Sequence, residues 1–153
     1  MMKSACHTHK TCIENAIEQA QRVCDENNSR FTALRKRVLE LVWAKHEPVK
    51  AYDLLAELQK EDRSAKPVTI YRTLNFLLSL GLVHKIHRHN TYVGCVNPDI
   101  EQPCLFLVCN NCNSVTEKHD TEYSNLIKNI SKKHRFKLSD TSFEIEGICS
   151  QCA

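Results

Sequence analysis

The sequence predicts an α+β protein: an N-terminal winged helix-turn-helix followed by a small α/β dimerisation domain with a Cys₄ zinc site. Helical periodicity runs through roughly the first 80 residues, and two short strand patterns follow it. Two Cys-x-x-Cys pairs, Cys109/Cys112 and Cys149/Cys152, then occur with 36 residues between them. We therefore expect a winged-helix DNA-binding domain over 1–95, a linker over 96–104 and a dimerisation and zinc-binding domain over 105–153.

The first domain is expected to contain four helices and a hairpin. Thr32 can cap the second helix, Pro67 fits the first turn of the fourth, and Gly81 is suited to end it. We expect the fourth helix of this domain to be the recognition helix of the winged helix. The expected elements are helices over 12–26, 33–46, 51–61 and 67–80, and strands over 82–87 and 91–95.

The second domain is expected to mix strands with one helix. We expect strands over 105–109, 136–138 and 142–146, a turn and then a strand over 112–118, and a helix over 121–133 with Tyr123, Leu126, Ile127 and Ile130 facing inward. A domain of about 50 residues is marginal alone. It therefore needs the zinc and a second copy of the chain, whose edge strand could pair with its own.

The two cysteine pairs have the spacing of a closed zinc site. Two residues between thiolates let a short turn aim both sulfurs at one point, and two such turns complete a tetrahedron. Soft thiolates favour Zn²⁺ over Mg²⁺ or Ca²⁺. A redox dithiol is the alternative, but such a motif occurs singly and near a βαβ pattern, which this sequence lacks.

The charge is unevenly distributed along the chain. Residues 1–95 hold 15 Lys and Arg against 10 Asp and Glu, a net charge of +5, whereas residues 96–153 have a net charge of −2. A basic N-terminal half suits a polyanion such as double-stranded DNA. The sequence has no apolar run of membrane-spanning length and no signal-peptide core, so we expect a cytoplasmic protein.

The start of the fourth helix carries the residues best suited to read DNA. Thr69 and Tyr71 can bond phosphates or touch thymine methyl groups, and Arg72 can reach a guanine edge or a phosphate. Tyr52 could contact a phosphate or be a half-buried core residue. Arg35 belongs to a basic cluster of three residues, of which one could contact a phosphate. The alternative for the fourth helix is an amphipathic helix with a polar face, and for the basic cluster it is a merely solvated face.

Several motifs together resemble the ferric uptake regulator superfamily. They are Arg30-Phe-Thr32-Ala-Leu-Arg35, Ala51-Tyr52-Asp53-Leu54-Leu55, Val68-Thr-Ile-Tyr71-Arg72-Thr-Leu74, Gly81-Leu-Val-His84-Lys85 and the two cysteine pairs. They occur in the family's order over essentially the whole chain, and within the family the sequence is most similar to the zinc uptake regulator branch. The resemblance implies a homodimeric repressor whose binding to operator DNA depends on metal, with Arg72 and Tyr52 at DNA-contacting positions.

A permanently filled structural site cannot sense metal, so a second site near the hinge is needed. Its candidate ligands are His84, His87, His89, Cys95, Cys104, Glu117 and His119. The resemblance aligns His84, Cys95 and Glu117 with regulatory zinc ligands. The family's fourth ligand is a histidine in the linker, where Cys104 is the nearest donor in this chain. His87 and His89 are expected to be exposed hairpin residues or phosphate contacts, and His119 is an alternative ligand.

The iron-sensing branch has a His-rich run with an Asp before its first Cys-x-x-Cys. This chain has Glu101-Gln-Pro-Cys104 there, without histidine, which argues against iron sensing. A further group at the N-terminus, Cys6, His7, His9 and Cys12, is either a weak metal site or a disordered start. Cys24 lies on the apolar face of the first helix and is expected in the core.

The expected function is a zinc-responsive transcriptional repressor of zinc uptake genes, with one structural and one regulatory zinc ion per subunit. A regulator of the same fold that responds to another metal or to thiol oxidation is the alternative. A zinc enzyme is not expected. A zinc deaminase, for example, needs a His-x-Glu motif, which is absent from the sequence.

Overall fold

The computed structural model describes residues 9–45, 47–99, 103–138 and 142–153. The chain divides into two compact units, one ending at Pro98 and the other beginning at Asp99. We refer to them as the N-terminal and the C-terminal unit. Among the described helices, none combines the length and the apolar character that a bilayer crossing requires.

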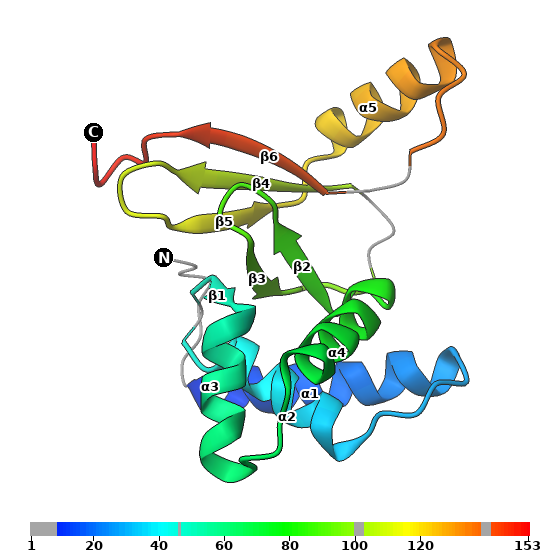
Figure 1. Ribbon diagram of the computed structural model, residues 1–153. Coiled ribbons are helices and arrows are strands. Elements are labelled where there is room, and N and C mark those ends of the chain that lie inside the picture. Colours follow the sequence, from blue (N-terminus) through cyan, green and yellow to red (C-terminus); the bar gives the residue numbers. More distant parts are fainter. Residues whose placement is uncertain (1–8, 46, 100–102, 139–141) are drawn as a thin grey trace. The chain divides into compact units, whose positions relative to one another are not determined.

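The N-terminal unit is a winged helix (Figure 1). Its three-stranded antiparallel sheet has the order β1-β3-β2. The four helices and the hairpin agree with the expectation from the sequence, whereas β1, which has only two residues, was not expected. The elements are α1 (His9–Glu26), α2 (Ala33–Trp43), β1 (Val49–Lys50), α3 (Ala51–Glu61), α4 (Pro67–Ser79), β2 (Val83–Ile86) and β3 (Thr91–Gly94).

The ends of the helices follow local signals in the sequence. The Thr32 side chain caps α2 by accepting a hydrogen bond from the Arg35 backbone N–H at 3.3 Å. Pro67 occupies the first turn of α4. Gly81 has a φ of +67°, and after it the Leu82 N–H donates to the Leu77 carbonyl at 3.0 Å. Glycine adopts this left-handed conformation without strain, which is why α4 ends here.

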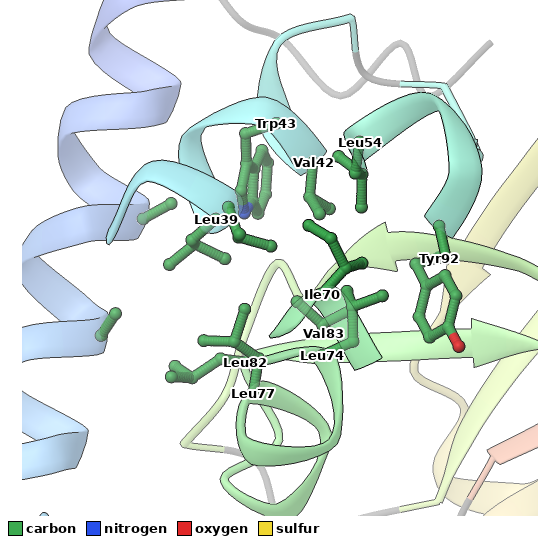
Figure 2. Close-up of a cluster of buried hydrophobic side chains, with 14 of the residues drawn as sticks. Leu39, Val42, Trp43, Leu54, Ile70, Leu74, Leu77, Leu82, Val83 and Tyr92 are labelled. Atoms are coloured by element: carbon green, nitrogen blue, oxygen red, sulfur yellow. The ribbon is translucent and has the colours of Figure 1, made fainter. Parts of the chain in front are cut away.

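The core of the N-terminal unit lies between the helices and the sheet (Figure 2). Each helix contributes apolar residues at helical spacing, and each such side chain contributes about 1.5–3 kcal/mol when fully buried. Cys24 is fully buried among them, as expected. The labelled members of the cluster are Leu39, Val42, Trp43, Leu54, Ile70, Leu74, Leu77, Leu82, Val83 and Tyr92.

The C-terminal unit is a three-stranded sheet with one helix, α5 (Thr121–Lys133). Its strands are β4 (Cys104–Cys109), β5 (Val115–Lys118) and β6 (Ser142–Gly147). The order is β5-β4-β6, with β4 antiparallel to β5 and parallel to β6. The linker expected over 96–104 includes 100–102, which lie outside the described residues. Cys104, which we placed in that linker, is the first residue of β4.

Two expectations for this unit were wrong. Residues 136–138 form no strand, because they complete the end of α5: Arg135 has a φ of 50° and the Phe136 N–H donates to the Ser131 carbonyl at 2.8 Å. The apolar residues of α5 do not all face inward. Leu126 is 55% exposed and Ile130 47% exposed, and Ser124 is the residue of α5 that is buried.

Gly94 leaves room for the Trp43 ring. A Cβ atom at Gly94 would lie 2.2 Å from Trp43 Cε2, far inside any real contact. We expect Gly94→Ala to lower the free energy of unfolding by about 1–3 kcal/mol, because the ring must leave its site in the core. Denaturant unfolding measures this change. Gly147→Ala is the matched control, since its Cβ would meet nothing within 4 Å. Equal stability of the two variants would contradict the packing.

Candidate metal centres and nucleic-acid interface

The four cysteines of the two Cys-x-x-Cys pairs converge at one end of the C-terminal sheet. Cys109 is the last residue of β4 and pairs in register with Gly147 of β6. The Asn110 N–H donates to the Gly147 carbonyl at 2.8 Å, which joins the turn after β4 to the chain beyond β6. Because of this parallel pairing, the turn that holds Cys149 and Cys152 lies beside the turn that holds Cys109 and Cys112.

The four sulfur atoms have the spacing of a tetrahedral metal site. All four Sγ atoms lie within 4.8 Å of one another, and those of Cys112 and Cys149 are 3.8 Å apart. A tetrahedron with Zn–S bonds of about 2.3 Å has edges of about 3.8 Å. The Cys₄ cluster therefore fits a zinc ion with little rearrangement, and its donor set is the one that structural zinc sites use.

The pKa values of Cys109 and Cys152 also favour the binding of a cation at this cluster. Hydrogen bonds from the Cys112 and Cys149 backbone N–H groups lower the pKa of Cys109 to about 6. Hydrogen bonds with Cys149 and Cys112 raise the pKa of Cys152 to about 12. Neighbouring thiolates repel one another, so without a metal the cluster ionises only in part. A dication would remove this repulsion and allow all four thiols to ionise.

A second group of potential ligands lies at the other end of β4. Cys104 begins β4 and Glu117 lies on β5, and the Cys104 Sγ atom is 3.7 Å from Glu117 Oε1. Burial and the neighbouring Glu117 carboxylate raise the pKa of the Cys104 thiol to about 12. The structure thus brings together the two residues that we assigned to the regulatory site in this unit. His119 Nε2 lies 3.0 Å from the same Glu117 oxygen.

The other two expected regulatory ligands lie on the wing of the N-terminal unit. His84 is on β2 opposite Val93, and Cys95 follows β3, where its N–H donates to the Leu82 carbonyl at 3.0 Å. Residues that are diagonal across an antiparallel pair lie on the same face. His84, which is half-buried, and Cys95, which is buried, therefore share one face of the hairpin. His87 is exposed in the hairpin turn, as expected, while His89 there is half-buried.

The first half of α4 presents polar side chains to solvent. Ile70, Thr73, Leu74 and Leu77 form its buried face. On the opposite face Tyr71 is 46% exposed, Arg72 is exposed and Thr69 is half-buried. At the start of α3, Tyr52 is 78% exposed, which excludes the alternative that it is a core tyrosine. These four residues have the exposure that contact with a nucleic acid requires.

The basic cluster on α2 has three different environments. The Arg35 guanidinium lies 3.3 Å from the centre of the Phe76 ring and donates to the Arg30 carbonyl, so it links α2 to α4. Arg37 forms ion pairs with Glu61 and Glu40, which raise the pKa of Arg37. Lys36 is exposed. The sequence could not separate these roles, because they depend on neighbours from other helices.

The N-terminal group of potential ligands lies only partly within the described residues. Cys6 and His7 lie outside the described residues, and the side chain of His9, the first residue of α1, does as well. Cys12 lies on α1.

The fold and the cluster together define a winged-helix protein with a thiolate metal centre in a second unit. The sequence profile of the ferric uptake regulator family matches residues 26–146. The zinc uptake regulation protein of Escherichia coli (strain K12) is 34% identical over 146 residues, which cover 94% of this chain and 84% of that protein. The chain belongs to the ferric uptake regulator family.

Solved structures show the same similarity. A zinc uptake regulator complexed with zinc and DNA is 33% identical, with a TM-score of 0.83, over 92% of this chain and 94% of that one. The crystal structure of holo XcZur is 32% identical, with a TM-score of 0.79, over 90% and 96% of the two chains. The fold expected from the sequence is therefore confirmed over nearly the whole chain.

Zinc binding to the Cys₄ cluster should depend on pH. At neutral pH the Cys152 thiol holds its proton, so zinc must displace protons in order to bind. We expect zinc affinity to fall as the pH falls toward and below 6, where Cys109 is protonated as well. Zinc titration of the metal-free protein at pH 5.5 and 7.5, with an indicator that counts released protons, measures both effects. Equal affinity at the two pH values would contradict binding by thiolates.

Proposed function

We propose that this protein is a cytoplasmic, zinc-responsive transcriptional repressor that binds operator DNA as a metal-loaded homodimer and represses zinc uptake genes. The main support is the similarity of nearly the whole chain to a zinc uptake regulator complexed with zinc and DNA. The residues of this chain support the proposal, because the chain has an exposed polar face on α4 and a cluster of four thiols with tetrahedral spacing.

The N-terminal unit binds DNA by inserting α4 into the major groove. Arg72 reaches a base edge or a phosphate, and Thr69 and Tyr71 contact phosphates or thymine methyl groups. Tyr52 at the start of α3 contacts the backbone. Lys66 is the N-cap of α4, and its side chain accepts no hydrogen bond from the first backbone N–H groups of the helix. A phosphate can take that place. Arg35 acts mainly through its contact with Phe76, which fixes α4 on α2.

The C-terminal unit forms the homodimer. It leaves Leu126 and Ile130 exposed on α5, and Leu107 and Ile145 exposed on the sheet. A hollow of about 400 Å³ on the sheet is lined by Leu107, Ile145 and Ile148, among others. Apolar surface of this extent in so small a unit is typical of an interface between subunits. A second copy of the chain covers it and places two recognition helices on a two-fold operator.

Each subunit binds two zinc ions. The Cys₄ ion is structural and holds the C-terminal unit together. The second, regulatory ion binds Cys104 and Glu117 from the C-terminal unit together with His84 and Cys95 from the N-terminal unit. Binding ligands from both units lets zinc favour the DNA-competent arrangement through its higher affinity for it, a coupling of about 1–3 kcal/mol or more. The mixed sulfur, nitrogen and oxygen donors suit Zn²⁺.

The second candidate is a regulator of the same fold that responds to another metal or to thiol oxidation. The lowered pKa of Cys109 and the exposure of Cys112 favour some reactivity of the cluster toward oxidants. The family's members are regulators, which argues against a zinc enzyme. DNA binding at fixed ionic strength, with free zinc buffered over a wide range and Fe²⁺, Mn²⁺ and peroxide as comparisons, distinguishes these candidates. An affinity for DNA that does not change with the concentration of free zinc would overturn the proposal.

Arg72→Ala should weaken operator binding by about 1–3 kcal/mol, because it removes a contact to a base or a phosphate. Titration of zinc-loaded protein into labelled operator DNA measures the change. Lys128→Ala is the control, since it removes the same charge from an exposed position on α5. Equal losses for the two variants would mean that Arg72 contributes only net charge.

Cys95→Ser should abolish the response of DNA binding to zinc and leave a folded dimer that retains the Cys₄ ion. The reason is that serine is a poor zinc ligand while the thiolate cluster is untouched. Cys24→Ala is the matched control, because Cys24 is a buried core residue of the same unit. Zinc content and zinc-dependent DNA binding are measured for both variants. A Cys95→Ser protein with the full response would remove Cys95 from the regulatory site.

A further inference from the structure

His119 has an environment that the four proposed regulatory ligands do not explain. Side chains alternate along β5, so Val115, Glu117 and His119 point to one face of the sheet. The register pairs Phe106 with Glu117, and its continuation by two residues sets His119 opposite Cys104. Cys104, Glu117 and His119 therefore share one face at this end of the C-terminal sheet, all within one unit.

The contacts centre on one oxygen of Glu117. Glu117 Oε1 lies 3.0 Å from His119 Nε2 and 3.7 Å from Cys104 Sγ. The Glu117 side chain is only 3% exposed. Both ring nitrogens of His119 are shielded from solvent, and neither makes a well-aligned hydrogen bond to a described residue. A buried carboxylate needs polar neighbours, and the His119 imidazole supplies one at 3.0 Å.

We propose that His119 is a positioning residue for the regulatory zinc site. Its imidazole holds the Oε1 side of the Glu117 carboxylate, so that Glu117 is oriented before the metal arrives. Carboxylates that bind metals are commonly held by such outer partners, and losing one costs about 10–100-fold in metal affinity. This role rests on the proposed function, because it requires Glu117 to be a zinc ligand.

Three variants of the full-length protein test this role. His119→Leu removes both ring nitrogens at similar volume, and His119→Gln keeps an N–H donor. His134→Leu is the matched control, because it removes an exposed histidine at the end of α5 in the same unit. Zinc affinity of the second site is measured by competition with a chromophoric chelator while the Cys₄ site stays filled. The absorption spectrum of the Co²⁺-substituted second site reports its ligands.

We expect His119→Leu to bind the second zinc ion about 10–100-fold more weakly, and His119→Gln to recover most of the loss. The control should bind like the unmodified protein, and the Co²⁺ bands should keep their positions in all variants. Wild-type affinity in His119→Leu would overturn the role. So would equal weakening in His119→Leu and His119→Gln with shifted Co²⁺ bands, since His119 would then be a ligand.

Glu117→Ala separates this role from the function on which it rests. If Glu117→Ala keeps the second zinc ion at full affinity, the proposed regulatory site is wrong and the role of His119 falls with it. If Glu117→Ala loses that ion and His119→Leu does not, the function stands and only the positioning role fails. Should His119→Leu not fold, His119→Asn replaces it, because its shorter amide cannot reach Glu117 in the same way.

Discussion

The C-terminal unit depends on the closure of its sheet by the Cys₄ cluster. Few of its side chains are fully buried, chiefly Phe106, Val108 and Val115, and the apolar face of α5 is largely exposed. A unit of this size buries so little apolar surface that it is only marginally stable alone. The parallel pairing of β4 with β6 brings the last turn of the chain to the turn after β4, where four thiols can take one metal ion. Metal binding then contributes directly to folding.

The N-terminal unit is under no such constraint. Its core draws side chains from all four helices and from the sheet, and the Arg35–Phe76 contact and the Arg37–Glu61 ion pair tie α2 to α4 and α3. A DNA-reading helix fixed in this way does not need metal in order to fold. Under the proposed function, a metal signal therefore acts on this unit by changing where it is held, through the proposed wing ligands His84 and Cys95.

Much of this architecture could be predicted because its signals are local. Thr32, Pro67 and Gly81 mark helix ends by their own chemistry, and the Cys-x-x-Cys spacing requires no knowledge of the fold. The errors have a common physical origin. Phe136 alternates like a strand residue but serves the end of α5, and Leu126 and Ile130 form an apolar stripe that stays exposed. The contact of His119 with Glu117 depends on strand register, which one sequence does not reveal.

The Cys₄ cluster and the Cys104–Glu117 pair differ in ways that suit different tasks under the proposed function. In the Cys₄ cluster backbone N–H groups already stabilise a thiolate on Cys109, and all four donors come from two turns of one unit. At the other end of β4 the Cys104 thiol is buried beside a carboxylate and holds its proton firmly. Zinc must displace that proton, so binding there is weaker at neutral pH than the donor atoms alone would give. Under the proposed function, zinc at this site must also bind ligands from the N-terminal unit. Both sites require zinc to displace a thiol proton, so under the proposed function it is the recruitment of ligands from two units that empties the second site first. The Cys₄ cluster then stays filled, and one chain can keep its fold while it responds to zinc.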